Sequence, residues 1–117
     1  LNETSIVMRL EVGPPAGGCA YLTGDIPKEI LQGLIDRQCG ILKVSHHGSK
    51  TGTSDEVLEK AKPKVAVIQV GKNSYGHPTK EVLDLLQAKR VKILRNDLEG
   101  AIELGIDNGK LRFESKN

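Results

Sequence analysis

The sequence has 117 residues, which is enough for one compact domain and too few for two of ordinary size. Its residues are 38% hydrophobic and 27% charged, a balance typical of globular proteins and not of disordered ones. The net charge is +2 and aromatic residues make up 3%. This composition does not indicate a nucleic-acid binder that works by overall charge or by stacking bases on aromatic side chains.

No stretch approaches the roughly eighteen apolar residues that a membrane-spanning helix needs, and the N-terminus has no signal-peptide pattern, so we expect a soluble domain. Leu1 leads at once into a strand-like segment without an initiating methionine, so we expect residues 1–117 to be a piece of a longer protein. Cys19 and Cys39 show no metal-ligand spacing, and one pair does not define a disulfide framework. We expect them to be two small core or surface residues.

The first half of the chain predicts two strands, a helix and a third strand. Residues 5–11 are rich in β-branched and apolar side chains, and residues 19–23 form a second strand after the Gly/Pro-rich turn at 13–18. The run 27–37 begins with a proline, which fits the first turn of a helix, and continues with apolar residues at helical spacing. Residues 41–45 are expected to form a short buried strand.

Helices and strands alternate through the second half. Ser54 is a candidate N-cap for a second helix that ends at Pro63, and Thr79 is a candidate N-cap for a third. The expected strands span residues 64–70, 91–94, 101–104 and 110–114, with a turn at 97–100 and a hairpin turn at 107–109. This order predicts a mixed α/β (α+β) domain, with a mixed sheet and helices on one face.

Three polar loops follow predicted strands and contain every histidine of the sequence. They are residues 23–25 (Thr-Gly-Asp), 45–49 (Ser-His-His-Gly-Ser) and 73–78 (Asn-Ser-Tyr-Gly-His-Pro). In sheets covered by helices, ligands commonly bind beyond the carboxyl ends of the strands. These loops are therefore the candidate site.

The first two loops carry candidate metal ligands. Asp25 ends a strand, which would hold a ligand rigidly. Adjacent histidines point in different directions, so one of His46 and His47 can enter a site while the other supports it or faces the substrate. Imidazole binds zinc and exchanges protons near neutral pH. The alternatives are that Asp25 caps the helix at 27–37 and that both histidines are exposed loop residues.

The histidine loop continues into candidates for anion binding. Residues 48–52 hold Gly, Lys and hydroxyl residues in the wrong order for a P-loop. The loop nevertheless precedes a helix N-terminus, which favours an anion. With Ser49, Lys50 and Lys72 at hand, a phosphate-bearing substrate is expected. A Ser49–His pair has no nucleophile-elbow motif around it.

His77 is the candidate chemical group of the third loop. Its neighbours are a glycine and a proline, which would hold its backbone, and its candidate roles are proton donor and phosphate contact. Asn73 and Tyr75 are candidates for the same rim. The alternative is a surface turn.

These segments together resemble one family. Residues 1–10, 21–25, 42–50, 70–78 and 95–102 look like the metallo-β-lactamase-fold domain at the C-terminus of ComEC-type DNA-uptake competence proteins. The resemblance runs in order through nearly the whole chain. It implies that residues 1–117 are the C-terminal part, or second half, of a four-layer αββα sandwich.

The resemblance also implies roles for the loops. Asp25 would bridge two metal ions, usually zinc, with manganese as the other candidate. His46 would ligate the second ion, with His47 as the fallback. A water activated by the metal would attack a phosphodiester, and His77 would contact the phosphate or assist the leaving group.

The family's principal metal motif, His-x-His-x-Asp-His, would lie upstream of Leu1, and residues 2–5 stand where many superfamily members have a further histidine. Two ligands do not complete a zinc site. We therefore predict that the isolated chain binds metal weakly and hydrolyses nothing. Its expected partners are the N-terminal half of the same domain, or a second copy packed on the uncovered sheet face.

The resemblance implies a metal-dependent phosphodiesterase or nuclease linked to DNA uptake in competence. Its parent would lie in the bacterial cell membrane with this domain facing outward. Two alternatives stay open: a degenerate domain that binds DNA or another polyanion, and a stand-alone metallo-hydrolase of small phosphoesters.

Overall fold

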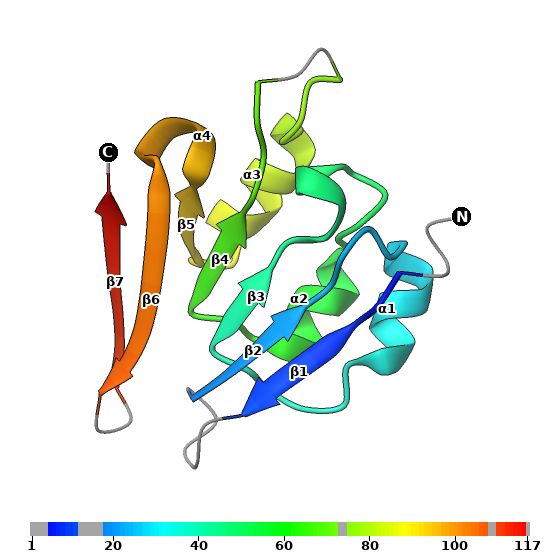
Figure 1. Ribbon diagram of the computed structural model, residues 1–117. Helices are drawn as coiled ribbons and strands as arrows, with labels where there is room; N and C mark the ends of the chain where they lie inside the picture. Colours follow the sequence, from blue (N-terminus) through cyan, green and yellow to red (C-terminus); the bar gives the residue numbers. More distant parts are fainter. Residues whose placement is uncertain (1–4, 12–17, 73–74, 108–109, 117) are drawn as a thin grey trace.

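The computed structural model describes residues 5–11, 18–72, 75–107 and 110–116 (Figure 1). The elements in chain order are β1 (Met8–Glu11), β2 (Cys19–Leu22), α1 (Lys28–Leu34), β3 (Ile41–Lys43), the short 3₁₀ segment η3 (Ser45–Gly48), α2 (Asp55–Ala61), β4 (Val65–Ile68), α3 (Lys80–Ala88), β5 (Lys92–Arg95), α4 (Asn96–Glu99), β6 (Ala101–Asp107) and β7 (Lys110–Lys116).

Five strands form one mixed sheet in the order β1-β2-β3-β4-β5. β1 pairs antiparallel with β2, and the pairs from β2 to β5 are parallel. Because strands that follow each other in sequence are also neighbours in the sheet, right-handed crossovers place α1, α2 and α3 on the same face (Figure 1). The predicted mixed α/β architecture, with helices on one face, is confirmed.

The helix starts agree with the capping signals in the sequence. The Ser54 hydroxyl accepts a hydrogen bond from the backbone N–H of Val57 at 3.2 Å, and the Thr79 hydroxyl accepts one from Val82 at 3.3 Å. α1 starts directly after Pro27 but ends at Leu34, three residues earlier than expected. A one-turn helix, α4, stands where a turn was expected at 97–100.

The main core lies between the sheet and the helices. Leu42 and Ile68 are fully buried there because alternate residues of each strand point to the helix side, and Leu31 of α1 and Leu86 of α3 pack against them from the helices. The expected strand at 5–11 pairs only from Met8 onward, because its partner β2 ends at Leu22 before the turn into the Asp25 loop.

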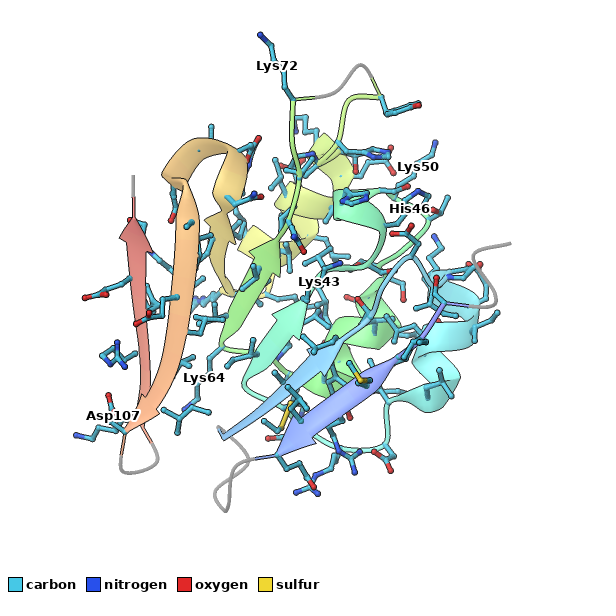
Figure 2. All side chains as sticks on the ribbon, viewed as in Figure 1. Lys43, His46, Lys50, Lys64, Lys72 and Asp107 are labelled. Carbon is cyan, nitrogen blue, oxygen red and sulfur yellow. A yellow bond between two sulfur atoms is a disulfide. The ribbon has the colours of Figure 1, made fainter. Side chains whose placement is uncertain are left out.

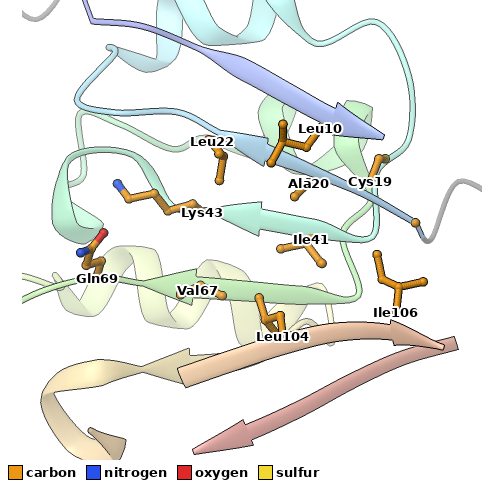
Figure 3. Close-up of a pocket in the computed structure, with 11 residues that line it drawn as sticks. Leu10, Cys19, Ala20, Leu22, Ile41, Lys43, Val67, Gln69, Leu104 and Ile106 are labelled. Carbon is orange, nitrogen blue, oxygen red and sulfur yellow. The ribbon is translucent and has the colours of Figure 1, made fainter. Parts of the chain in front are cut away.

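The other face of the sheet is only partly covered. The hairpin β6–β7 forms a separate two-stranded sheet beside β4 and β5 (Figure 1). Between β6 and the main sheet lies a cavity of about 350 Å³ (Figure 3). Its lining is mostly apolar: Leu10, Gly18, Cys19, Ala20, Leu22, Ile41, Lys43, Val67, Gln69, Leu104 and Ile106.

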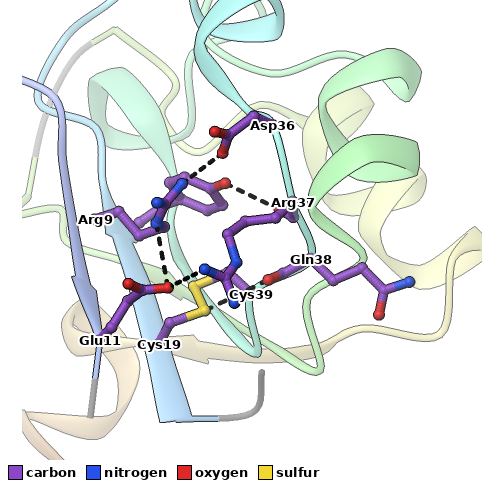
Figure 4. The surroundings of a disulfide bond; sticks show 8 residues. Arg9, Glu11, Cys19, Asp36, Arg37, Gln38 and Cys39 are labelled. Atoms are coloured by element: carbon purple, nitrogen blue, oxygen red, sulfur yellow. Dashed lines mark hydrogen bonds and ion pairs between the residues drawn. A yellow bond between two sulfur atoms is a disulfide. The ribbon is translucent and has the colours of Figure 1, made fainter. Parts of the chain in front are cut away.

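The cysteines form a disulfide, which the expectation of two small core or surface residues did not include. Cys19 at the start of β2 and Cys39 just before β3 have Cα atoms 5.1 Å apart and bonded sulfurs (Figure 4). The parallel register pairs Ala20 with Ile41, and this brings the two cysteines together although 20 positions separate them. Both are buried, so the expectation of a core position is right.

Ion pairs surround the disulfide on the surface. Arg9 contacts Glu11 and Asp36, and Arg37 contacts Glu11 at 2.5 Å (Figure 4). They tie β1 to the segment that carries Cys39. Among the described helices, none is long and apolar enough to cross a bilayer.

Candidate functional site

The first polar loop is held in place by its neighbours. The Thr23 hydroxyl donates to the carbonyl of Lys43, and the Ser5 hydroxyl accepts from the backbone N–H of Asp25 at 3.3 Å. The N-cap residue of α1 is Pro27, which has no capping side chain, and the backbone N–H of Lys28 donates to the carbonyl of Thr51 at 2.8 Å. Asp25 is therefore not a helix cap, and the carboxylate is available for another role.

The histidine loop is bound to the first loop and carries backbone strain. The backbone N–H of His46 donates to Gly24 at 2.9 Å, and the Ser45 hydroxyl donates to Ile26 at 2.6 Å. His46 and His47 have φ values of 53° and 57°. A left-handed conformation costs a residue with a side chain about 1–2 kcal/mol, and such strain concentrates at functional sites.

The structure brings Asp25 together with His47. Nε2 of His47 lies 3.9 Å from Oδ1 of Asp25, and both side chains are about half exposed. Zinc bonds nitrogen and oxygen at about 2.0–2.2 Å, so in its usual tetrahedral arrangement two ligand atoms lie about 3.4 Å apart. The two atoms are about 0.5 Å farther apart than this, so a small movement of the exposed side chains would bring both within reach of one ion.

The tautomer of His47 suits this role. Nδ1 lies 2.7 Å from the backbone carbonyl of Gln69, and a carbonyl only accepts hydrogen bonds, so Nδ1 carries the proton. In the neutral ring Nε2 then presents its lone pair on the side of Asp25. Metal-binding histidines are commonly oriented by this contact between the second ring nitrogen and a carbonyl.

His46 has different surroundings. Its ring lies 5.6 Å from that of His77 and 6.2 Å from that of His47, in edge-to-face arrangements. Its Nδ1 is buried and has no hydrogen-bond partner among the described residues. Burial, and then the neighbouring His46 and His47, lower the pKa of His77 below its usual value. His77 therefore favours its neutral form.

Four residues singled out in the sequence line one cavity of about 210 Å³. They are His47, Lys72, Tyr75 and His77, and Val70 and Gly71 complete the wall. Tyr75 stacks on His77 with ring centroids 5.9 Å apart. The predicted grouping of the second and third loops is thus present in space. Asn73 lies outside the described residues.

The other two substrate-binding candidates lie elsewhere. Ser49 is buried, and its hydroxyl hydrogen-bonds to that of Thr51 at 3.0 Å within its own loop. Lys50 lines a separate cavity of about 190 Å³, together with Lys28, Thr53 and Glu81. Neither is a wall of the histidine cavity.

In the part of the chain that the structure describes, no group of three or more His, Cys, Asp or Glu side chains is arranged to hold a metal ion. A further cation, Lys43, lies at the carboxyl end of β3, near the loops that carry Asp25 and His47. Lys43, on the open face of β3, is half-buried, and Asp25 acts on it electrostatically (Figures 2 and 3). Lys43 was not singled out from the sequence, although a lysine within an otherwise apolar strand indicates a charged side chain in a partly buried position.

Comparison with known proteins gives three relatives, and no family model matches the chain. The chain is 38% identical over 112 residues to ComE operon protein 3 of Bacillus subtilis, which covers 92% of the chain and 14% of that protein. It is 33% identical over 119 residues to Competence protein ComA of Neisseria gonorrhoeae, covering 97% of the chain and 17% of that protein.

Recombination protein 2 of Haemophilus influenzae is 30% identical over 117 residues, covering 97% of the chain and 14% of that protein. The chain thus spans about a sixth or less of the length of these relatives. It is homologous to a segment of the ComEC-type competence proteins.

Proposed function

We propose that this chain is the second half of a metallo-β-lactamase-type domain that hydrolyses phosphodiesters, DNA included, during DNA uptake in competence. The observation that carries the proposal is the pair of Asp25 and His47, 3.9 Å apart, with His47 oriented by the Gln69 carbonyl. A polyanion-binding surface needs neither this spacing nor a fixed tautomer. The geometry therefore favours a metal site over a degenerate DNA-binding domain.

The donor set fits zinc, with manganese as the second candidate. One carboxylate oxygen and one imidazole nitrogen are ligands that both ions accept. Bound zinc would lower the pKa of water and neutralise charge on a phosphodiester. Between the two histidines we propose His47 as the ligand and assign His46 to support, since its ring packs against His77.

The remaining ligands would come from the part of the protein that precedes this chain. A zinc site for hydrolysis needs at least three protein ligands, and Asp25 and His47 supply two. The partly covered sheet face, with its cavity of about 350 Å³, supports packing against that preceding half in an αββα sandwich. Packing of two copies through the same face is the competing arrangement.

The chain's own residues would then bind and orient the substrate. Lys72 lies on the wall of the histidine cavity and would attract a phosphate. His77, with its lowered pKa, would be neutral during the reaction and would donate a hydrogen bond from its ring N–H to an oxygen of the phosphodiester. Tyr75 is 81% exposed and stacks on His77, and its ring would form the outer border of the site.

The disulfide supports a location in an oxidising compartment. Disulfides persist outside the reducing cytosol, in the periplasm and at the cell surface. The Cys19–Cys39 bond thus favours a domain that faces outward from a membrane-bound parent.

The proposal is tested by phosphodiester hydrolysis with the full-length protein. Hydrolysis of a labelled oligonucleotide should stop on metal chelation, return with zinc or manganese, and be lost in Asp25→Asn. The matched control is Asp84→Asn, an exposed carboxylate of α3 paired with Lys80, which should hydrolyse at the wild-type rate. Hydrolysis that is insensitive to chelation, or equal in Asp25→Asn and wild type, would refute the proposal.

A further inference from the structure

The open face of the sheet changes character along the strands. Toward the amino ends of β2, β3 and β4 its side chains are apolar, with Ala20 and Ile41 as examples. Toward the carboxyl ends polar side chains join the apolar ones, with Lys43 on β3 and Gln69 just past β4 (Figure 3). The polar end is the edge that carries Asp25 and His47.

Lys43 is a cation in an unfavourable place. Leu22 and Val67 stand at the registers on either side of it, and burial lowers the pKa of its ammonium more than Asp25 raises it. Among the described residues it has no ion-pair partner, and it does not reach Asp25 directly. A half-buried charge without a partner costs free energy that a bound anion would offset.

The direction of the side chain indicates where that anion sits. Figure 3 shows the ammonium extending past the end of β3, toward the loops and away from Ile41, Leu104 and Ile106. A metal ion between Asp25 and His47 would neutralise the carboxylate and leave Lys43 beside added positive charge. Electrostatic balance at this edge then calls for an anion that contacts metal and ammonium together.

We propose that Lys43 binds a non-bridging oxygen of the substrate phosphate, on the sheet-face side of the site, opposite the histidine cavity. A phosphate held there would approach Asp25 and His47 from the open face of the sheet. His77 and Lys72, which line the histidine cavity, would approach the same phosphate from the side of the loops. The inference rests on the proposed function for the metal and extends it with a second wall of the site. The competing partner for Lys43 is a carboxylate on the half that would cover the sheet.

The test uses the full-length protein with Lys43→Met, Lys43→Arg and the matched control Lys64→Met. Lys64 is an exposed lysine just before β4, at the opposite end of the sheet, and its loss removes the same charge (Figure 2). Steady-state hydrolysis of a phosphodiester, inhibition by inorganic phosphate, metal content and thermal unfolding are measured for each. Calorimetric binding of inorganic phosphate to the zinc-loaded protein adds a readout that needs no turnover.

Lys43→Met should raise KM and weaken phosphate binding at least about tenfold, since a lost charge-assisted hydrogen bond acts on ground state and transition state alike. Metal content should stay at the wild-type level, Lys43→Arg should retain most of the affinity, and Lys64→Met should match wild type. If Lys43→Met binds phosphate as tightly as Lys64→Met, the inference is overturned. The same holds if Lys43→Met lowers the melting temperature and leaves phosphate binding unchanged. That result would indicate that Lys43 pairs with a carboxylate of the half that would cover the sheet.

The two failures are separable. Absence of metal-dependent hydrolysis in the wild type would refute the proposed function, and the phosphate titration would still decide the role of Lys43. Normal hydrolysis with unchanged phosphate affinity in Lys43→Met would refute this inference alone.

Discussion

Gly48 is the point where the histidine loop meets the His77 loop, and Gly48→Ala should loosen both. A Cβ at this position would lie 2.5 Å from Cβ and 2.9 Å from Cα of Pro78, and 3.4 Å from Ile68. Its φ of +85° is also in the region that favours glycine. The Gly48 carbonyl accepts the backbone N–H of Thr79 at 3.0 Å, so a shift would reach the start of α3.

The cost follows from these two effects. A left-handed residue with a Cβ costs about 1–2 kcal/mol, and overpacking a buried contact costs about 1–3 kcal/mol. Gly48→Ala should therefore lower the free energy of unfolding by roughly 2–5 kcal/mol. At about 4 °C per kcal/mol for a chain of this size, the melting temperature should fall by about 8–20 °C.

Gly33→Ala is the matched control. Gly33 lies inside α1, and a Cβ there would meet no atom within 4 Å. Alanine should stabilise the helix by about 0.5–1 kcal/mol, the opposite sign to Gly48→Ala. Both are measured by urea and thermal unfolding of the 117-residue chain, followed by circular dichroism. A Gly48→Ala chain within about 0.5 kcal/mol of wild type would refute the account of this contact.

Two further predictions concern the disulfide and pH. Replacing Cys19 and Cys39 by alanine should lower the free energy of unfolding in urea by about 3 kcal/mol, because the unfolded chain loses a constraint between residues 20 positions apart. A reductant should destabilise the wild type and leave the double variant unchanged. A wild type whose stability does not change with reductant would contradict the disulfide. The pKa of His77 is lower in the folded chain than its usual value of 6.5, so His77 contributes its full stabilisation of the folded state above pH 6.5. This stabilisation is lost as the pH falls through the lowered pKa of the folded chain. His77→Asn should therefore flatten the pH dependence of stability below about pH 6.5, and an unchanged slope would be the contrary result.

Much of the fold follows from local signals in the sequence. Apolar runs bounded by turn residues predict the strands, and Ser54 and Thr79 cap helices where the sequence predicts them. The lengths were less predictable, because the extent of β1 depends on how far its partner β2 runs. The disulfide was missed since it depends on the parallel register of β2 and β3, which local patterns do not specify.

The site was predicted as a group of loops but not in its detailed geometry. That strand ends would gather Asp25, the histidine pair and His77 follows from a parallel sheet. Which histidine faces Asp25 depends on left-handed backbone at both His46 and His47, which residues with side chains seldom adopt. Ser49 comes directly after this left-handed segment, and its hydroxyl bonds within its own loop, to that of Thr51.

The metal content of the full-length protein, measured by elemental analysis after desalting, tests the pairing of Asp25 with His47 most directly. His47→Ala and Asp25→Asn should each lose bound metal, because each removes one of the two proposed ligands, whose atoms lie 3.9 Å apart. His46→Ala should keep it, since that ring packs against His77. Full metal content in His47→Ala, together with loss in His46→Ala, would contradict the account.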